Sequence, residues 1–461
     1  MIPTLVLGLG ESGLAMAQWL ARGGARVRAA DTRAEPPNAR ELAATAPGVE
    51  LVAGPFAPTL LDGIERLAIS PGLSQRDPLV AEARRRGIPI TGEIELFAQG
   101  LRATGARERC RVIAITGTNG KTTVTSMAGV MAAAAGADAA VAGNISPSAL
   151  AELMRREDSG RMPDLWVLEL SSFQLETTET LRPEAATVLN VSDDHLDRYD
   201  GLADYAAAKA RIFLGAGVQV LNRDDPAVMA MRQPGLEAVS FGLGPAPGAR
   251  DFGLVEHAGE HWLAAGQEPL MPLYELPLAG SHNAANALAA LALCSAAGLP
   301  LPHLVKGLRG FRGLPHRVEK VAEFGGVAFY DDSKGTNVGA TLAALQGLGR
   351  KVVLIAGGDG KGQDFSPLAA AVQAHARAVV LIGRDGPRIE QAIRDTTIPR
   401  LHAEDMAQAV RAARDAASPG DAVLLSPACA SFDMFRNYAH RAEVFVAAVR
   451  ALEPKKGGRW N

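Results

Sequence analysis

The stretch "AITGTNGKTTVT", residues 114–125, ends an apolar run, turns through two glycines and opens onto Lys121 and two threonines. This order predicts a β-strand, a phosphate-binding loop and a helix. The usual loop, G-x-x-x-x-G-K-[S/T], is longer, because only two residues separate Gly117 from Gly120 here. The stretch therefore favours a nucleotide site in an α/β domain, the alternative being a glycine-rich turn beside a surface lysine.

The residue types of this loop suit a nucleoside triphosphate. Gly117 and Gly120 leave the backbone room to wrap phosphate oxygens, and Lys121 places a positive charge on the outer phosphates. The hydroxyl of Thr122 can bind Mg²⁺, and Thr123 can serve the same helix start. We therefore expect ATP and Mg²⁺ at this loop.

On both sides of this loop, along the whole chain, apolar runs typical of buried strands alternate with segments of helical periodicity. Such alternation is typical of parallel sheets covered by helices, and 461 residues suffice for about three domains. The sequence predicts an α/β protein with domains at residues 1–107, 108–312 and 313–461.

A second glycine motif, "GLGESG", opens the first domain at Gly8, Gly10 and Gly13, and Asp31 follows. Such glycines let a diphosphate approach a helix N-terminus. A structural turn, NAD and another nucleotide diphosphate all fit this motif. The Gly-Lys-Thr loop weighs against NAD, because a hydride-transfer enzyme has no need of it.

Composition excludes several classes of protein. Lysine and arginine total 47 against 50 acidic residues, a net charge of -3, so neither nucleic acid nor an anionic membrane is an expected partner. No apolar run of about 18 residues is present. The three cysteines are far apart, with neither disulfide nor zinc spacing, which favours a reducing cytoplasm.

Several further motifs make the chain resemble one particular protein family. "GTNGKTT" resembles the shortened loop of the Mur ligase family, which includes folylpolyglutamate synthases. "AGNIS", "ELSSFQLE", "NVSDDHLDRY", "GSHNAANALAAL", "LPHRVE", "DDSKGTN" and "LSPACASFDMF" follow in the family's order. "ELSSFQLE" and "SPACASFD" resemble the glutamate-adding members. The resemblance implies a Rossmann-like UDP-binding domain, a central ATPase domain with a P-loop-type parallel sheet and a Rossmann-like C-terminal domain.

The resemblance also implies a reaction. ATP activates the alanine carboxylate of UDP-N-acetylmuramoyl-L-alanine as an acyl phosphate, and the amine of D-glutamate attacks it, in peptidoglycan precursor synthesis. It implies two Mg²⁺ ions, and we expect a monomer.

Besides Thr122, three positions are candidates for the metal sites. Glu169 ends the apolar run "LWVLE", where ligands bind in open parallel sheets, although a simple loop contact is the alternative. Sequence context alone favours a structural role for His195 and an exposed position for Lys209. The resemblance instead makes Glu169 and Thr122 ligands of one Mg²⁺ and His195 of a second. It also makes Lys209 a carbamylated lysine, whose carbamate could bind a cation that an ammonium would repel.

The resemblance extends to the other site residues. It assigns ATP to Gly117, Thr118, Asn119, Gly120, Lys121, Thr122, Thr123, Asn286, Arg317, Asp332 and Lys334. It assigns the UDP-linked substrate to Gly10, Glu11, Ser12, Gly13, Asp31, Thr32, Arg33, Ser70, Asn144 and His195, and glutamate to Thr336, Lys361, Ser431 and Tyr438. It makes catalytic residues of Lys121, Glu169, His195, Lys209, Asp332 and Lys334.

Two positions depart from the family pattern, and two other functions remain open. Ser146 stands where Gly is expected, and Tyr438 where Phe is expected. An amide ligase that adds a diamino acid would favour added acidic residues, whereas Lys361 favours an acidic substrate. A P-loop ATPase that drives motion would need an aspartate-ended second strand, and no convincing one is present.

Overall fold

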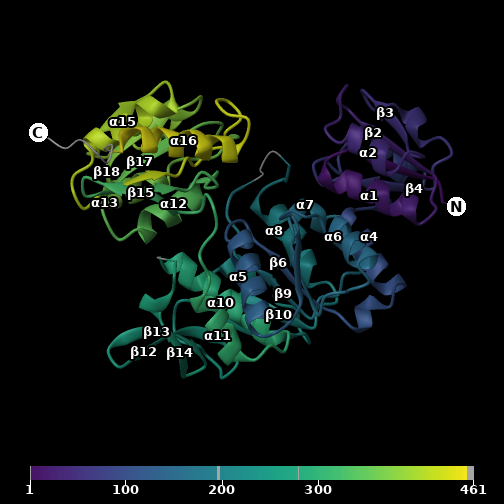
Figure 1. Ribbon diagram of the computed structural model, residues 1–461, viewed down its shortest axis with the longest axis horizontal. Helices are drawn as coiled ribbons and strands as arrows, with labels where there is room; N and C mark the ends of the chain where they lie inside the picture. The colour runs from purple at the N-terminus through teal and green to yellow at the C-terminus, as the bar shows by residue number, and fades with distance from the viewer. Residues whose placement is uncertain (1, 195–197, 279, 454–461) are drawn as a thin grey trace, which may run out of the picture. The chain divides into compact units, whose positions relative to one another are not determined.

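The structure is a computed structural model that describes residues 2–194, 198–278 and 280–453. Three β-sheets, each accompanied by helices, follow one another along the chain (Figure 1). This is the predicted α/β architecture. Among the described residues, no helix is both long enough and apolar enough to cross a membrane.

The first sheet is wholly parallel. Its strands, in spatial order, are β3 (Glu50–Ala53), β2 (Val27–Asp31), β1 (Thr4–Leu7), β4 (Arg66–Ile69) and β5 (Ile90–Thr91). Its helices are α1 (Glu11–Arg22), α2 (Ala39–Thr45), α3 (Pro78–Arg85) and α4 (Glu93–Ala103). Val6 packs into one apolar cluster, and its neighbours Leu5 and Leu7 pack into another. Both faces of the sheet are therefore covered, as its unbroken apolar strands require.

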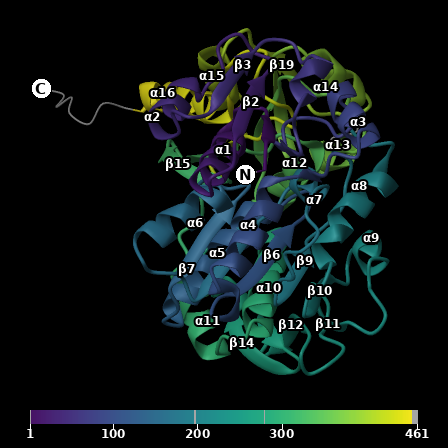
Figure 2. The ribbon, with the colours of Figure 1, turned by 90° about the vertical axis from the view of Figure 1, so that its right-hand side faces the viewer.

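The central sheet is parallel at one end and antiparallel at the other. From the parallel edge its strands are β7 (Ala139–Gly143), β8 (Leu165–Glu169), β6 (Arg111–Thr116), β9 (Ala185–Val188), β10 (Val218–Asn222) and β11 (Glu237–Phe241). Figure 2 shows β6, β9, β10 and β11 following one another. The sheet continues with β12 (Phe252–His257), which pairs in parallel with β11, and then with β13 (Glu260–Ala265) and β14 (Glu268–Pro272), which pair antiparallel. The predicted parallel sheet is present, and the antiparallel strands at its other edge are an addition that the sequence did not indicate.

Helices surround the central sheet and supply parts of the site. They are α5 (Lys121–Ala134), α6 (Ala149–Asp158), α7 (Ser172–Leu175), α8 (Leu202–Ala210), α9 (Pro226–Met229), α10 (Ser281–Ala296) and α11 (Leu301–Arg309). In the described part of the chain, short 3-10 turns lie at Pro58–Leu61, Ala106–Glu108, Arg211–Phe213 and Leu273–Glu275. The apolar run before the Gly-Lys-Thr loop is β6 and the segment after it is α5, as predicted.

The third sheet is parallel except at one edge. Its strands are β15 (Glu319–Phe324), β16 (Val327–Asp331), β20 (Ala422–Leu425), β17 (Val352–Gly357), β18 (Ala376–Ile382) and β19 (Arg400–His402), and β15 runs antiparallel to β16. The helices are α12 (Val338–Gly347), α13 (Leu368–His375), α14 (Gly386–Ala392), α15 (Met406–Ala416) and α16 (Tyr438–Leu452). Alternate residues of β17, such as Leu354 and Ile355, pack into separate apolar clusters, so both faces are buried.

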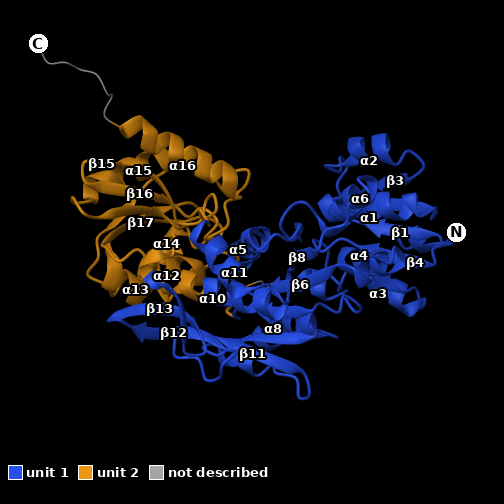
Figure 3. Cartoon of the chain, turned by 60° about the horizontal axis from the view of Figure 1, so that its bottom comes forward, with its two compact units in different colours: residues 1–191, 198–273, 286–310 blue, residues 192–197, 274–285, 311–461 orange. Residues whose placement is uncertain are grey.

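The chain forms two compact units (Figure 3). Unit 1 comprises residues 1–191, 198–273 and 286–310, and unit 2 comprises residues 192–197, 274–285 and 311–461. Unit 1 holds the first two sheets because they share α4, which packs on α1, α6 and α7. Gly100 of α4 has no room for a side chain, since a Cβ there would lie 2.6 Å from Trp19 and 2.9 Å from Leu153.

Candidate active site

The Gly-Lys-Thr loop joins β6 to α5 and has little spare space. Gly120 has a φ of 85°, in the left-handed region that favours glycine. A Cβ at Gly120 would lie 2.5 Å from the Oδ1 atom of Asn286, a residue of α10. Asn286 therefore lies against the loop, where the resemblance expects it beside ATP.

Protein groups hold the loop in shape. The Nζ atom of Lys121 donates to the carbonyls of Gly117 at 2.7 Å and Thr118 at 2.9 Å. The N–H of Asn119 donates to the Oδ1 atom of Asn190 at 2.8 Å, and the amide of Asn190 donates back to the Asn119 carbonyl. Thr118 and Thr123 are buried, and Thr122 is half-buried at the helix start. Protein contacts therefore fix the loop, and the Lys121 ammonium folds back onto its carbonyl groups.

Lys209 contacts this loop, and Glu169 lies on the neighbouring strand, opposite Ile115 of β6. Lys209 is buried, donates to the Gly117 carbonyl at 3.0 Å and lies 4.2 Å from the centre of the Tyr205 ring. Glu169, at the end of β8, accepts from Asn144 at 2.9 Å through Oε1. Its Oε2 atom is buried, and no hydrogen-bond partner for it lies among the described residues. A buried carboxylate oxygen beside a phosphate loop suits a hard cation.

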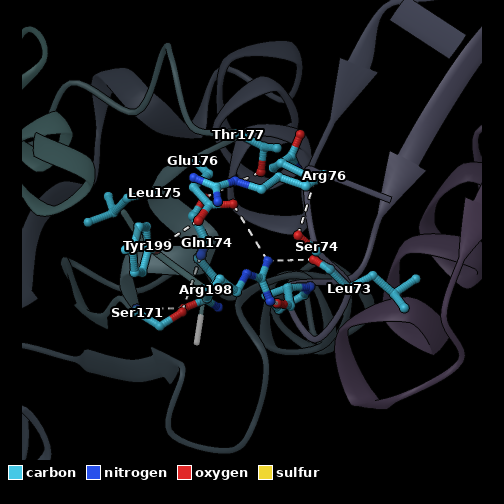
Figure 4. A network of polar contacts seen from close by, with 12 residues as sticks. Leu73, Ser74, Arg76, Ser171, Gln174, Leu175, Glu176, Thr177, Arg198 and Tyr199 are labelled. Atoms are coloured by element: carbon cyan, nitrogen blue, oxygen red, sulfur yellow. Dashed lines mark hydrogen bonds and ion pairs between the residues drawn. The ribbon is translucent and has the colours of Figure 1, made fainter. Parts of the chain in front are cut away.

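His195 lies outside the described residues, but Arg198 just after it joins two loops (Figure 4). The Arg198 guanidinium donates to the carbonyls of Pro71 at 3.0 Å and Leu73 at 2.5 Å. It lies 3.5 Å from a carboxylate oxygen of Glu176 and 3.9 Å from the centre of the Phe173 ring. Arg198 thereby fixes the loop after β4, which begins at Ser70, to α7.

The first glycine loop packs closely against its helix. A Cβ at Gly13 would lie 1.8 Å from the Gly8 carbonyl oxygen, so only glycine fits there. The N–H of Leu9 donates to the buried Asp31 carboxylate at 2.7 Å. The Arg33 guanidinium makes two bonds to the same carboxylate and holds the pKa of Asp31 well below its usual range. Asp31 and Arg33 are thus engaged with each other.

The remaining first-domain candidates divide into two groups. Gly10 is the N-cap residue of α1, and no side chain caps that helix. Ser70 is buried next to Gly8, whereas Thr32 is exposed. Glu11 and Ser12 instead reach other parts of unit 1. The Glu11 carboxylate accepts from Ser146, and the Ser12 hydroxyl donates to Glu93 at 3.3 Å.

In unit 2, three loops meet at the carboxyl ends of β16, β17 and β20. The N–H of Ala428 donates to the Gly335 carbonyl at 3.0 Å, and Asp359 pairs with Ala430 in a β-bridge. Lys361 is exposed with a φ of 49°, whereas Ser431 is buried. The loops that carry the four predicted glutamate residues are therefore adjacent. Those residues are Thr336, Lys361, Ser431 and Tyr438.

A buried acid, Asp332, supports the loop after β16. Asp332 accepts from the Ser426 hydroxyl at 2.7 Å, and burial raises the pKa of Asp332 to about 7 although this bond opposes the rise. The positive charge of Arg317 also acts on Asp332 to lower its pKa. The Nζ atom of Lys334 lies 3.8 Å from the centre of the Tyr438 ring, a favourable cation–π contact. Tyr438, which stands where the family pattern has Phe, is thus the aromatic partner of Lys334.

Sequence reasoning missed several residues that organise these loops: Glu93, Gln174, Arg198, Ser426 and Arg441. Arg441 is buried, donates to the Ser333 carbonyl at 2.8 Å and to the Cys429 carbonyl at 3.1 Å, and so connects two of the unit 2 loops. Each missed residue binds protein groups far away in sequence. No local pattern distinguishes such a side chain from a surface one.

Comparison with protein families finds three matches along the chain. The Mur ligase MurD-like N-terminal domain matches residues 3–92, the Mur ligase middle domain matches residues 115–294, and the Mur ligase glutamate ligase domain matches residues 316–429. Together these matches cover most of the chain.

Individual relatives give closer matches. A UDP-N-acetylmuramoylalanine–D-glutamate ligase of Aromatoleum aromaticum is 61% identical over 97% of both chains. The enzyme of the same name from Nitrosospira multiformis is 58% identical over 98% of this chain and 96% of its own. Among solved structures, a UDP-N-acetylmuramate–alanine ligase of Thermotoga maritima aligns over 98% of this chain and 100% of its own, with a TM-score of 0.61 at 20% identity. That structural match supports the fold alone, including its three-domain α/β architecture.

Proposed function

The chain belongs to the Mur ligase family, and from this membership we propose that it joins D-glutamate to UDP-N-acetylmuramoyl-L-alanine at the expense of ATP. The product is a peptidoglycan precursor with one new amide bond. The observation that carries the proposal is the 61% identity to a named D-glutamate ligase across 97% of both chains.

The loop geometry is consistent with the first chemical step. Gly117–Thr123 would hold the ATP phosphates on the N-terminus of α5, where backbone N–H groups and Lys121 face negative charge. The alanine carboxylate takes the terminal phosphoryl group, ADP leaves, and an acyl phosphate forms. Lys121 places a cationic side chain beside the Gly117 carbonyl, and Lys209 lies against the same carbonyl.

The second step uses the unit 2 loops. The amine of glutamate attacks the acyl carbon, and the resulting tetrahedral intermediate expels phosphate. Lys361, Ser431 and Thr336 would bind the two glutamate carboxylates through a cation and hydroxyl donors. Water must be kept from the acyl phosphate during this exchange.

Magnesium is part of the proposal. The residues suit it, because Glu169 offers a buried carboxylate oxygen and Thr122 a hydroxyl at the same loop. When bound, Mg²⁺ neutralises charge on the transferred phosphoryl group. His195 is proposed for a second ion on the family resemblance.

Lys209 is proposed to carry a carbamate. Its burial and its place beside the phosphate loop support this, since a buried ammonium there would oppose a cation at Glu169. We also propose that the chain acts as a monomer in the cytoplasm, in keeping with its cysteine content.

The competing functions differ in what they need. A ligase that adds a diamino acid must recognise a distal amine, whereas the exposed Lys361 offers a cation. An ATPase that drives motion gives no role to the first glycine loop. Neither alternative has an observation of its own in its favour.

One assay tests the proposed function. Purified protein is given ATP, Mg²⁺ and UDP-N-acetylmuramoyl-L-alanine, with D-glutamate, L-glutamate or a diamino acid, and ADP and product mass are measured. We expect ADP release coupled to a product only with D-glutamate. ADP release at the same rate without any amino acid would instead identify an ATPase.

A further inference from the structure

Two carboxylates from the first domain reach the N-terminus of helix α6 in the central domain. Glu93, the first residue of α4, is fully enclosed, and its Oε1 atom accepts from the N–H of Leu150 at 2.9 Å. Burial raises the pKa of Glu93 to about 7, although the N–H groups of Leu150 and Ala149 oppose the rise. Helices α4 and α6 lie side by side, so the carboxylate enters the first turn of α6 directly (Figure 1).

The other oxygen of Glu93 faces the first glycine loop. The Ser12 hydroxyl donates to Oε2 at 3.3 Å, and the Gln174 amide of α7 donates to the same atom at 3.4 Å. One buried side chain therefore joins α1, α6 and α7. A carboxylate at helix N–H groups is favourable there because the helix dipole is positive at that end.

Glu11 makes a second contact beside the first. Its Oε1 atom accepts from the Ser146 hydroxyl at 2.8 Å and from the N–H of Ser148 at 2.9 Å. Ser146 is the residue that departs from the family pattern, and its hydroxyl supplies a donor that glycine lacks. We call Glu11, Glu93, Ser12 and Ser146, together with the backbone N–H groups of residues 148–150, the α6 clamp.

The segment before α6 is fixed independently on the central sheet. The N–H of Asn144 donates to the Glu169 carbonyl at 2.7 Å, and its side-chain amide donates to the Glu169 carboxylate. A Cβ at Gly143 would lie 2.3 Å from the same carbonyl oxygen. Asn144 therefore contacts Glu169 through both its backbone and its side chain, and the clamp residues Ser146 and Ser148 follow it in the same segment.

We propose that Glu93, assisted by the Glu11–Ser146 pair, is a positioning residue for the UDP-linked substrate. This inference rests on the proposed function. The clamp holds the diphosphate-binding loop of the first domain at a fixed distance from Asn144, so one extended substrate contacts both. It acts on binding of that substrate and leaves the phosphoryl-transfer site unchanged.

Kinetics and direct binding test the proposal. Wild type, Glu93→Gln, Ser146→Ala and Glu95→Gln are compared, with each of the three substrates varied in turn. Binding of UDP-N-acetylmuramoyl-L-alanine alone is measured by calorimetry. For Glu93→Gln we expect about a tenfold rise in Kd and KM for this substrate, as for loss of a charge-assisted bond. Its kcat and its KM for ATP and D-glutamate should stay within about twofold.

Glu95→Gln is the matched control. Glu95 is buried in the same helix and also crosses to the central domain, where it accepts from the N–H groups of Glu179 and Thr180. It lies away from the glycine loop, so its loss should lower Tm and leave KM for the UDP-linked substrate unchanged. Ser146→Ala, at the outer edge of the clamp, should give a rise of about threefold even if Glu93→Gln fails to fold.

Three results would overturn the proposal: an unchanged Kd in both clamp variants, an equal rise in KM for all three substrates, or the same rise in Glu95→Gln. A wild type that binds the UDP-linked substrate but forms no product would contradict the proposed function instead. The calorimetric comparison would then still decide the role of the clamp.

Discussion

At the scale of single residues, the site relies on charged groups that the protein has removed from water. Lys209 and Asp332 are both buried, and each binds a group contributed by a distant part of the chain. Burial makes the charged form of such a side chain costly unless a partner compensates. These residues therefore offer the clearest individual tests.

Replacing Lys209 with Ala should reduce kcat by roughly a hundredfold or more, because a group that orders charge around the phosphates is lost. Steady-state ADP release measures the effect, and Lys306→Ala, on the exposed face of α11, is the control. Partial recovery on adding a short carboxylic acid would support the carbamate. Full activity in a folded Lys209→Ala protein would rule out the proposed role.

Asp332 should make stability depend on pH in a defined direction. Its pKa rises from 3.8 in the unfolded chain to about 7 in the folded protein, so the folded state binds the proton more tightly. This contribution is complete below the unfolded value and is lost as pH rises through about 7. Relative to Asp332→Asn, the wild-type free energy of unfolding should fall by about 3 kcal/mol between pH 5 and 8.

Urea unfolding at several pH values measures this difference. Asp395→Asn, at a side chain that is 90% exposed, is the control and should follow the wild-type profile. A constant difference between wild type and Asp332→Asn across this range would show that Asp332 is ionised throughout.

At the scale of elements, each glycine loop depends on contacts that leave no room for a side chain. Gly13 belongs to α1, yet its Cα lies against the carbonyl of Gly8 in the preceding turn. The G-x-G-x-x-G spacing indicates such a contact, because its third glycine allows the helix to pack closely on the strand.

Replacing Gly13 with Ala should destabilise the protein by roughly 3 kcal/mol or more, because the new methyl group meets backbone atoms that cannot move independently. Gly10→Ala is the matched control. A Cβ at Gly10 would have nothing within 4 Å, so its cost should be about 1 kcal/mol at most. Equal urea midpoints for the two variants would contradict this account of the loop.

Elements with strong local signals could be predicted, and elements without them could not. The strand, loop and helix around Lys121 were predicted because apolar residues and glycines mark each boundary. The hairpin from β12 to β13 was missed, since its turn at Ala258–Gly259 places a non-glycine residue at a φ of 53° and lacks the usual Asn-Gly signal. Glu93 resembled an ordinary acidic residue in a first helical turn.

At the scale of the whole molecule, the order of motifs predicted the three-domain architecture. It did not predict the packing contacts between the first two domains. Three parallel-sheet domains followed from the alternation of apolar runs and helices, and the comparisons confirm that architecture. The residue roles and the domain limits remain predictions. The sharing of α4 by two sheets was not foreseen, because a helix that is buried on several sides looks locally like any apolar helix.

The α6 clamp has a consequence for how the molecule separates its anionic ligands. Three helices begin at loops near the proposed site, and each has a positive end. Side chains of the protein already occupy that end in α6, where Ser148 caps Ala151 and two carboxylates take the preceding N–H groups. Neither α1 nor α5 has a side-chain cap. Protein groups therefore already offset the positive end of α6, whereas the positive ends of α1 and α5 have no side-chain cap to compete with an anionic ligand.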